Sequence, residues 1–405
     1  MTERLYYEDA YLTEFEATVV EQAAGRVYLD RSAFYPTSGG QPFDVGVLRP
    51  AEGTGPELRV VDVIDEGERV AHVVAAEGHA LAVGSRVRGQ LDWHRRFDHM
   101  QQHTGQHLLS AVFQEQLGMS TLSVHFGTEA ATLDLDAGSL SPEQLAGVED
   151  RANAVVFENR PVTASVEENA AALRKQSTRT GPLRVVSIAA LDRSACGGTH
   201  VRHTGEIGPI LLGRVERVRK AARVEFVCGS RATRRARAHH QALTRLGAAL
   251  STSVDSAVDV VSTRLAALER DSAALRKARE SLDGYRAAEL YVQARARAGT
   301  EGLAICLERR ADGALQEHRG LAQSYVKHSR AVFIAAIDQP AALLLATSED
   351  SGVDAGVALK AALAHGGGRG GGSARVAQGS LDDVATLDAA LSALLVRFAP
   401  GPASG

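Results

Sequence analysis

Short stretches rich in β-branched and aromatic residues follow one another along the first 90 residues. Clusters of glycine, proline and acidic residues separate them, which is the pattern of strands joined by turns. The stretches lie at residues 15–20, 26–30, 57–64 and 69–75. Their regular spacing predicts a small β-barrel over residues 1–90.

The pattern becomes helical from Asp98 to about Leu117, where Leu108, Leu109, Val112 and Phe113 supply an apolar face. A second helix is expected from Ser141, an N-cap serine followed by Pro142, to about residue 158. Strands are expected at 121–127, 131–136, 162–167, 183–189, 208–215 and 222–228. Helices on an antiparallel sheet predict a two-layer α+β domain over residues 91–230.

Residues 231–298 are predicted to be a helical arm. Apolar side chains follow heptad spacing at Val254, Val258, Val261, Leu265, Leu268, Leu275 and Leu282. Ser272 and Arg279 occupy positions where an apolar residue is expected. The pattern therefore favours a helical hairpin or a short coiled coil over a long two-stranded rod.

A last unit is predicted over residues 299–405. The uninterrupted apolar runs 331–337 and 341–347 indicate a buried hairpin, and a helix is expected near 354–364. The glycine-rich segment 366–372 follows. It is either a flexible linker or a loop whose backbone amides cradle phosphate or sugar oxygens. It lacks the strand and the Lys-Ser/Thr of a P-loop, so we expect an α/β domain with a glycine-rich loop but no ATP site.

Composition narrows the class of protein. A length of 405 residues predicts two or three domains. The net charge of −4 leaves any nucleic-acid binding to local basic patches. The three cysteines form no disulfide framework, the first nine residues do not resemble a signal peptide, and no apolar run is long enough to span a membrane. We therefore expect a cytoplasmic protein.

Two short motifs carry candidate metal chemistry. His103 and His107 are four residues apart in a predicted helix, so both imidazoles share one face. Cys196 and His200 flank a Gly-Gly pair, which favours a tight loop. Three imidazoles and a thiolate suit Zn²⁺ better than calcium or magnesium. The two motifs together predict a shared zinc site.

Two further features leave alternatives open. Gly39 and Gly40 are either an ordinary turn or a bare stretch of backbone that a ligand can approach closely. A basic run is either a solvated face or a stripe that tracks the phosphates of a nucleic acid. Its members are Arg214, Arg217, Arg219, Lys220, Arg223, Arg231, Arg234, Arg235 and Arg237.

The ordered motifs FYPTSGGQ, HTGQHLLSA and CGGTHV, followed by a glycine-rich module, resemble the standalone alanyl-tRNA editing proteins in their long form. These are in turn similar to the editing and C-terminal parts of alanyl-tRNA synthetase. Residues 1–230 carry the specific motifs, and residues 299–405 resemble the DHH-associated C-terminal domain. The resemblance implies hydrolysis in trans of tRNA(Ala) mischarged with serine or glycine.

Carried over by position, the resemblance makes His103, His107, Cys196 and His200 the zinc ligands. It also assigns Gly39 and Gly40 to substrate selection. Some relatives have threonine just before the second histidine, where this chain has Gln106. We therefore name Gln106, Ser123 and His125 as candidate catalytic groups and Thr104 as a candidate substrate contact. The resemblance also allows a homodimer formed through the helical arm or the C-terminal domain.

Zinc can polarise an ester carbonyl and lower the pKa of water, but a catalytic zinc usually keeps one position free of protein ligands. Four protein ligands leave two roles open: expansion to five ligands, or orientation of the substrate. The main alternative function is a non-catalytic, zinc-stabilised tRNA- or RNA-binding protein. A phosphoesterase is disfavoured because the acidic DHH motif is absent, and a metalloprotease because HxxxH lacks the glutamate of HExxH.

Overall fold

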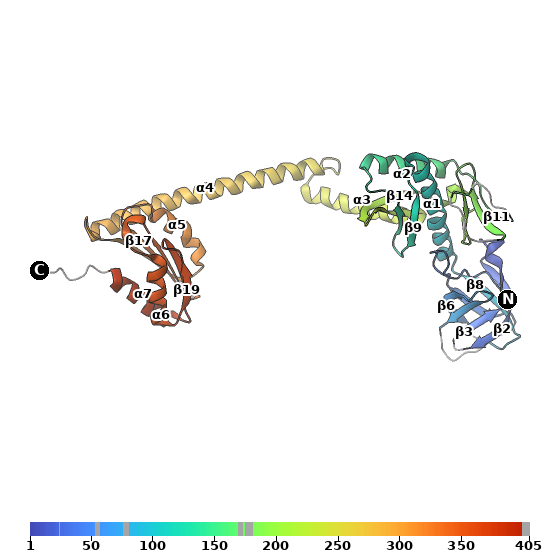
Figure 1. The fold of residues 1–405 in the computed structure, drawn as a ribbon, viewed down its shortest axis with the longest axis horizontal. Helices are drawn as coiled ribbons and strands as arrows, with labels where there is room; N and C mark the ends of the chain where they lie inside the picture. Colours follow the sequence, from blue (N-terminus) through green and yellow to red (C-terminus); the bar gives the residue numbers. More distant parts are fainter. Residues whose placement is uncertain (24, 53–56, 76–80, 169–172, 175–180, 399–405) are drawn as a thin grey trace. The chain divides into compact units, whose positions relative to one another are not determined.

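A computed structural model describes the chain except residues 24, 53–56, 76–80, 169–172, 175–180 and 399–405. The protein divides into two compact units, Met1–Leu246 and Gly247–Gly405, and each is described by itself (Figure 1). Both combine helices with mostly antiparallel sheets, so the expected α+β class is confirmed. Among the described residues, no helix is long and apolar enough to cross a membrane.

The first unit begins with a closed barrel of six antiparallel strands, as the sequence predicts. Alternate residues of β2, such as Phe15, Ala17 and Val19, fill its interior. β1 (Glu3–Arg4) and β4 (Arg31–Ser32) pair outside the barrel. In spatial order the barrel strands are β2 (Glu14–Ala23), β3 (Arg26–Leu29), β7 (Val70–Val74), β6 (Leu58–Asp65), β5 (Gly46–Pro50) and β8 (Arg86–Leu91). The sequence prediction missed β5 and β8.

Helix α1 (Trp93–Leu117) follows the barrel and starts five residues earlier than predicted. The cause is an Asp92 N-cap, whose side chain accepts from the Arg95 amide. The second predicted helix, α2 (Pro142–Phe157), has the expected Ser141 cap, completed by Gln144 into a capping box. These two helices pack over the sheet formed by residues between 121 and 228.

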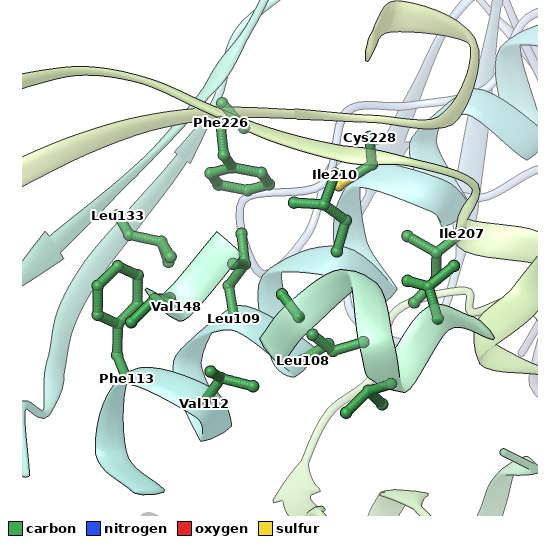
Figure 2. Packing of buried hydrophobic residues seen from close by; sticks show 14 of the residues in the cluster. Leu108, Leu109, Val112, Phe113, Leu133, Val148, Ile207, Ile210, Phe226 and Cys228 are labelled. Atoms are coloured by element: carbon green, nitrogen blue, oxygen red, sulfur yellow. The ribbon is translucent and has the colours of Figure 1, made fainter. Parts of the chain in front are cut away.

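That sheet has four antiparallel strands in the order β14 (Ile210–Val218), β15 (Ala221–Cys228), β10 (Ala131–Leu135) and β9 (Thr121–Phe126). Figure 2 shows its core, in which Leu108, Leu109 and Val112 of α1 meet Phe226 and Ile210 of the sheet. A second antiparallel sheet contains β11 (Val162–Glu167), β12 (Leu183–Ile188) and β13 (Asp192–Ala195). Helix α3 (Gly229–Leu250) continues directly from β15.

The second unit starts with the last four residues of α3 and continues into α4 (Ala257–Ala298), a helix of 42 residues. A five-stranded sheet follows, with the order β16 (Ala304–Asp312), β17 (Ala331–Gln339), β18 (Ala342–Thr347), β20 (Val376–Ser380) and β19 (Arg369–Gly372). The predicted hairpin is β17 and β18. Both of its faces are buried, against α6 (Ala355–Gly366) and α7 (Val384–Phe398) on one side and α4 and α5 (Arg319–Tyr325) on the other. Burial on both faces explains the uninterrupted apolar runs.

The glycine-rich segment is not the loop that the sequence predicts. Residues 369–372 form β19, which pairs antiparallel with β20. Its glycines let the backbones approach closely, since a Cβ on Gly372 would lie 2.3 Å from the Val376 carbonyl oxygen. Amides that join this ladder do not cradle a phosphate, and only the turn at Gly367 and Gly368 between α6 and β19 remains outside regular structure.

Candidate metal centre

The two predicted motifs meet in the first unit. His103 and His107 lie on one face of α1, and Cys196 and His200 lie in the loop that follows β13. One ligand atom from each of the four residues lies within 4.8 Å of all the others. Cys196 Sγ is 3.4 Å from His103 Nε2 and 3.3 Å from His200 Nε2. The group can therefore hold one metal ion.

The other ring nitrogen of each histidine has its own partner. His103 Nδ1 is 2.7 Å from Gln41 Oε1, and His107 Nδ1 is 3.0 Å from Asp192 Oδ2. His200 Nδ1 is 3.1 Å from Thr104 Oγ1. Such partners fix the ring orientation and the tautomer that leaves Nε2 free to ligate. A zinc ion fits this donor set, because the Nδ1 positions are held and the Nε2 atoms converge on the thiol.

The electrostatics of the cluster also suit a cation. Although burial raises the pKa of the Cys196 thiol, the electrostatic interactions with His103 and then His200 hold that pKa well below its usual value. Burial lowers the pKa of His200 to about 3. Burial also lowers that of His107, but hydrogen bonds to Asp192 and Cys196 outweigh it and raise the pKa of His107 to about 9. A thiolate and a neutral imidazole are the forms that bind a metal, so Cys196 and His200 have the required forms, whereas His107 must release a proton when a metal binds.

The Gly39-Gly40 pair forms a tight turn that delivers Gln41 to this cluster. Both glycines have positive φ, +59° and +87°, and Ser38 and Gln41 exchange backbone hydrogen bonds across them. Gln41 is buried, and its amide also donates to Thr199 Oγ1 at 2.7 Å while its oxygen accepts from the Thr199 amide at 3.0 Å. One side chain thus joins the barrel to α1 and to the Cys196 loop.

The Cys196 loop is held by close packing and by an arginine. A Cβ on Gly198 would lie 2.2 Å from His103 Cε1, so only glycine fits there. Arg184 Nη1 donates to the carbonyl oxygens of Cys196 and Gly198, both at 2.9 Å. The sequence did not predict these supporting roles. Gln41 and Thr199 lie within the motifs FYPTSGGQ and CGGTHV, whereas Asp192 and Arg184 lie outside every motif.

The other predicted site residues take varied positions. Thr104 is fully buried, and its hydroxyl contacts His200 Nδ1 and the Val201 amide. Gln106 is buried and donates to Ser110 Oγ at 2.9 Å. Ser123 and His125 are exposed and alternate on β9 with Phe126, whose ring centroid is 5.3 Å from that of His103. They therefore lie on the opposite face of the strand.

The structure also places the predicted basic residues. Arg217 lies near the end of β14, and Arg219 and Lys220 form the turn between β14 and β15. Arg214 forms an ion pair with Glu216 at 2.8 Å, and Arg235 pairs with Glu225. Arg234 is exposed on α3. The neighbouring Arg231 is buried against Asp98, so the basic run is partly neutralised by acids distant in sequence.

Two family models match the chain. The model of tRNA synthetases class II (A) matches residues 5–95, and that of the threonyl and alanyl tRNA synthetase second additional domain matches residues 183–223. The first match covers the barrel and the second covers β12 to β15 with the Cys196 loop. The fold and the site thus define a protein whose first unit shares two segments with tRNA synthetases.

Relatives specify the family. The alanyl-tRNA editing protein AlaX-M of Methanosarcina acetivorans is 36% identical over 239 residues, which are 55% of this chain and 97% of that protein. AlaX-L of Pyrococcus horikoshii is 36% identical over 57% of this chain and 59% of its own length. The chain belongs to the alanyl-tRNA editing protein family.

Longer relatives match almost the whole chain. The alanine–tRNA ligase of Methanoregula boonei is 34% identical over 96% of this chain. The chain covers 43% of that ligase, and 43% of the ligase of Pyrococcus abyssi. It therefore spans less than half the length of these ligases. A solved C-Ala domain of Aquifex aeolicus alanyl-tRNA synthetase matches 24% of the chain at 19% identity and a TM-score of 0.22, too low to define the fold.

Proposed function

We propose that the protein is a zinc-dependent deacylase. It hydrolyses the ester bond between tRNA(Ala) and a wrongly attached serine or glycine. The observation that carries this proposal is the convergence of His103, His107, Cys196 and His200 with a separate anchor on each imidazole, in a member of an editing family. Zinc bound there would supply Lewis acidity toward the ester carbonyl. The products are free tRNA and the amino acid.

The chain's own residues would then position the ester. Gln41, Asp192 and Thr104 hold the three imidazoles in register, and Arg184 fixes the Cys196 loop. The Gly39-Gly40 turn leaves bare backbone beside Phe126, since a Cβ on Gly40 would lie 3.5 Å from that ring. We propose that this turn contacts the substrate's amino acid, where no side chain intervenes.

Discrimination between serine and alanine needs a polar contact for one hydroxyl. An apolar pocket rejects an added hydroxyl by a factor on the order of 100 only, whereas a site that hydrogen-bonds it can select the wrong ester for hydrolysis. Gln106 and Thr104 lie on the helix that carries two of the ligands. We propose them, with Ser123 and His125, as the groups to test for hydroxyl recognition or catalysis.

Alanine variants of these four residues separate the roles. Loss of kcat with unchanged KM for the seryl ester would assign a residue to catalysis. Loss of the preference for the seryl over the alanyl ester would assign it to recognition. Thr104→Ala also removes a contact to His200, so its zinc content must be measured beside its activity.

We also propose how the tRNA and a second copy of the chain bind. Arg217, Arg219, Lys220 and Arg234 supply exposed positive charge for acceptor-stem phosphates. In the second unit, the apolar heptad positions of α4 are open to solvent. Leu265, Leu268, Leu275 and Leu282 are 57%, 62%, 55% and 66% exposed. A 3.5-residue apolar repeat on a long helix is typical of a coiled-coil seam, which favours a homodimer through α4.

The test is deacylation of Ser-tRNA(Ala), Gly-tRNA(Ala) and Ala-tRNA(Ala) by the full chain. We expect rapid loss of the seryl ester and sparing of the alanyl ester. Cys196→Ala should be folded by circular dichroism, free of zinc and inactive, whereas Cys306→Ala, in the second unit, should retain activity. A folded, zinc-loaded protein that hydrolyses none of the three esters would leave a zinc-stabilised RNA-binding protein in place of the enzyme.

A further inference from the structure

A cavity of about 490 Å³ opens beside the metal-ligand cluster, within the first unit. Its walls come from the barrel loop, the first turns of α1, the end of β9 and the start of α3, through Pro42, His94, Arg95, His99, Phe126 and Arg234. None of the four metal ligands lines it. It is therefore a separate space, which we call the α1 pocket.

The α1 pocket lies one helical turn from the metal centre. His99 and His103 are four residues apart on α1, so their side chains share a face with Cβ atoms roughly 5–6 Å apart. Phe126 forms a common wall, because it lines the pocket while its ring contacts that of His103 at a centroid distance of 5.3 Å. Pro42 directly follows Gln41, the partner of His103. The α1 pocket therefore adjoins the metal-ligand cluster.

The charges at the pocket favour an anion. The carboxylate of Asp98 is occupied by Arg231, whose Nε lies 3.0 Å from both of its oxygens. Arg95 Nε donates to the Phe43 carbonyl oxygen at 2.9 Å. Within the described residues, Arg95 and Arg234 have no carboxylate partner. Two guanidinium groups beside His94 match a phosphate, for which arginine is well suited.

A second observation points to a polar group of the ligand. His99 is 6% exposed and lines the pocket, yet its Nδ1 has no hydrogen-bond partner in the described chain. A buried polar atom without a partner is destabilising, and such atoms are uncommon in folded proteins. Phe126 and Pro42 add apolar surface on which a base can pack. The pocket therefore offers a site for a phosphate, a surface for a base and a partner for a polar group, which are the parts of a nucleotide.

We propose that the α1 pocket binds the 3′-terminal nucleotide of the tRNA acceptor strand and so places the aminoacyl ester at the metal centre. This inference rests on the proposed function. The terminal 5′-phosphate lies against Arg95 and Arg234, and the base or ribose meets His99 and Phe126. A free mononucleotide presents the same chemical groups. The test below distinguishes it from the terminal nucleotide of a tRNA.

The test measures the equilibrium binding of deacylated tRNA(Ala), intact or lacking its terminal adenosine, to the full chain. Removal of the adenosine should weaken binding to the wild type about tenfold, the size expected for one stacked base. In Arg234→Gln and His99→Gln, removal of the terminal adenosine should lower the affinity for tRNA by less than about threefold. Arg237→Gln removes the same charge from α3 outside the pocket and should behave as the wild type.

Other results would overturn the inference in distinguishable ways. If removal of the terminal adenosine lowers tRNA affinity equally in the wild type and in both variants, the terminal nucleotide does not bind in the pocket. This conclusion would hold even if Ser-tRNA(Ala) is hydrolysed. Binding of free AMP that depends on Arg234, with tRNA binding indifferent to the adenosine, would assign the pocket to a free nucleotide. A wild type that neither binds tRNA nor hydrolyses the ester would refute the proposed function itself. Because Arg234 is exposed, its variant keeps the test valid if His99→Gln fails to fold.

Discussion

Gln41 Oε1 lies 2.7 Å from His103 Nδ1, although the two residues are 62 positions apart in the sequence. Gln41 belongs to the barrel loop and His103 to the metal-binding face of α1. Since the same glutamine also bonds Thr199 in the Cys196 loop, one buried amide links all three segments that build the site. The barrel is therefore part of the metal centre's support.

The first prediction concerns this amide. Gln41→Ala should lower zinc affinity about 10- to 100-fold, because His103 loses the partner that orients its ring. Competition with a chromogenic chelator measures the change. Gln116→Ala, an exposed glutamine near the end of α1, is the matched control and should bind zinc as the wild type does. Unchanged affinity in Gln41→Ala would show that the contact does not orient the ligand.

The second prediction concerns a buried ion pair that fixes the barrel loop to α1. Arg96 and Asp44 are both fully buried and bonded, and Arg96 also donates to the carbonyl oxygens of Ala10 and Ala33. Arg96→Met should lower the free energy of unfolding by about 3–5 kcal/mol, because it leaves a buried carboxylate unpaired. Urea unfolding followed by fluorescence of Trp93, the single tryptophan, measures it.

The control for that experiment is an exposed pair. Arg49 and Glu57 are 2.5 Å apart with about half of each side chain exposed. Arg49→Met should cost less than about 1 kcal/mol, since exposed pairs contribute little. Similar losses in the two variants would contradict the role assigned to Arg96.

The third prediction is a pH dependence of barrel stability. His72 is fully buried, with Nε2 2.7 Å from Ser32 Oγ and Nδ1 2.9 Å from the Val27 carbonyl oxygen. Burial lowers the pKa of His72 from 6.5 to about 4, against the smaller opposing effect of the Val27 bond. The unfolded chain therefore binds the proton more readily. The stability from His72 is complete above pH 6.5 and falls as pH drops toward 4.

His72→Gln isolates this contribution. Between pH 7 and pH 4 the wild type should lose about 3 kcal/mol more stability than the variant, at roughly 1.4 kcal/mol per pKa unit. The free energy of unfolding is measured against pH for both proteins, and the two profiles are subtracted. Any pH-independent effect of the substitution on stability cancels in this difference. Burial also lowers the pKa of His99 and His200, so both proteins should lose some stability on acidification. Parallel profiles would contradict the prediction.

The fourth prediction concerns the exposed seam of α4. Leu268→Asp with Leu275→Asp should convert a dimer to a monomer in sedimentation velocity, because buried charges at heptad positions oppose association. Ala266→Asp adds a charge on the same helix outside the seam and should leave the dimer intact. A wild type that is monomeric at all accessible concentrations would refute the proposed seam.

The sequence alone predicted the four residues that the structure brings together as a candidate metal site, and most of the elements. His103 and His107 could be paired because i and i+4 side chains always share a helix face, a local rule that needs no partner. The Gly-Gly pair between Cys196 and His200 likewise predicted a loop, and the Ser141 cap predicted the start of α2. The strands β5 and β8 were missed, although each pairs with the other to help close the barrel. The four-part division of the chain into domains stays a prediction.

Only the tertiary structure decided what surrounds those ligands. Gln41, Asp192 and Arg184 are ordinary residue types, and they become part of the site only because packing brings the barrel loop and the second sheet to α1. Arg231 and Arg235 have no acidic residue close to them in the sequence, yet in the folded chain they form ion pairs with Asp98 and Glu225. Residues 369–372 form a strand because their backbone pairs antiparallel with β20. The local sequence pattern does not predict this pairing. Helix and strand periodicity can be identified from neighbouring residues in the sequence. Burial, ion pairing and the walls of the pocket depend on contacts between segments that are distant in the sequence.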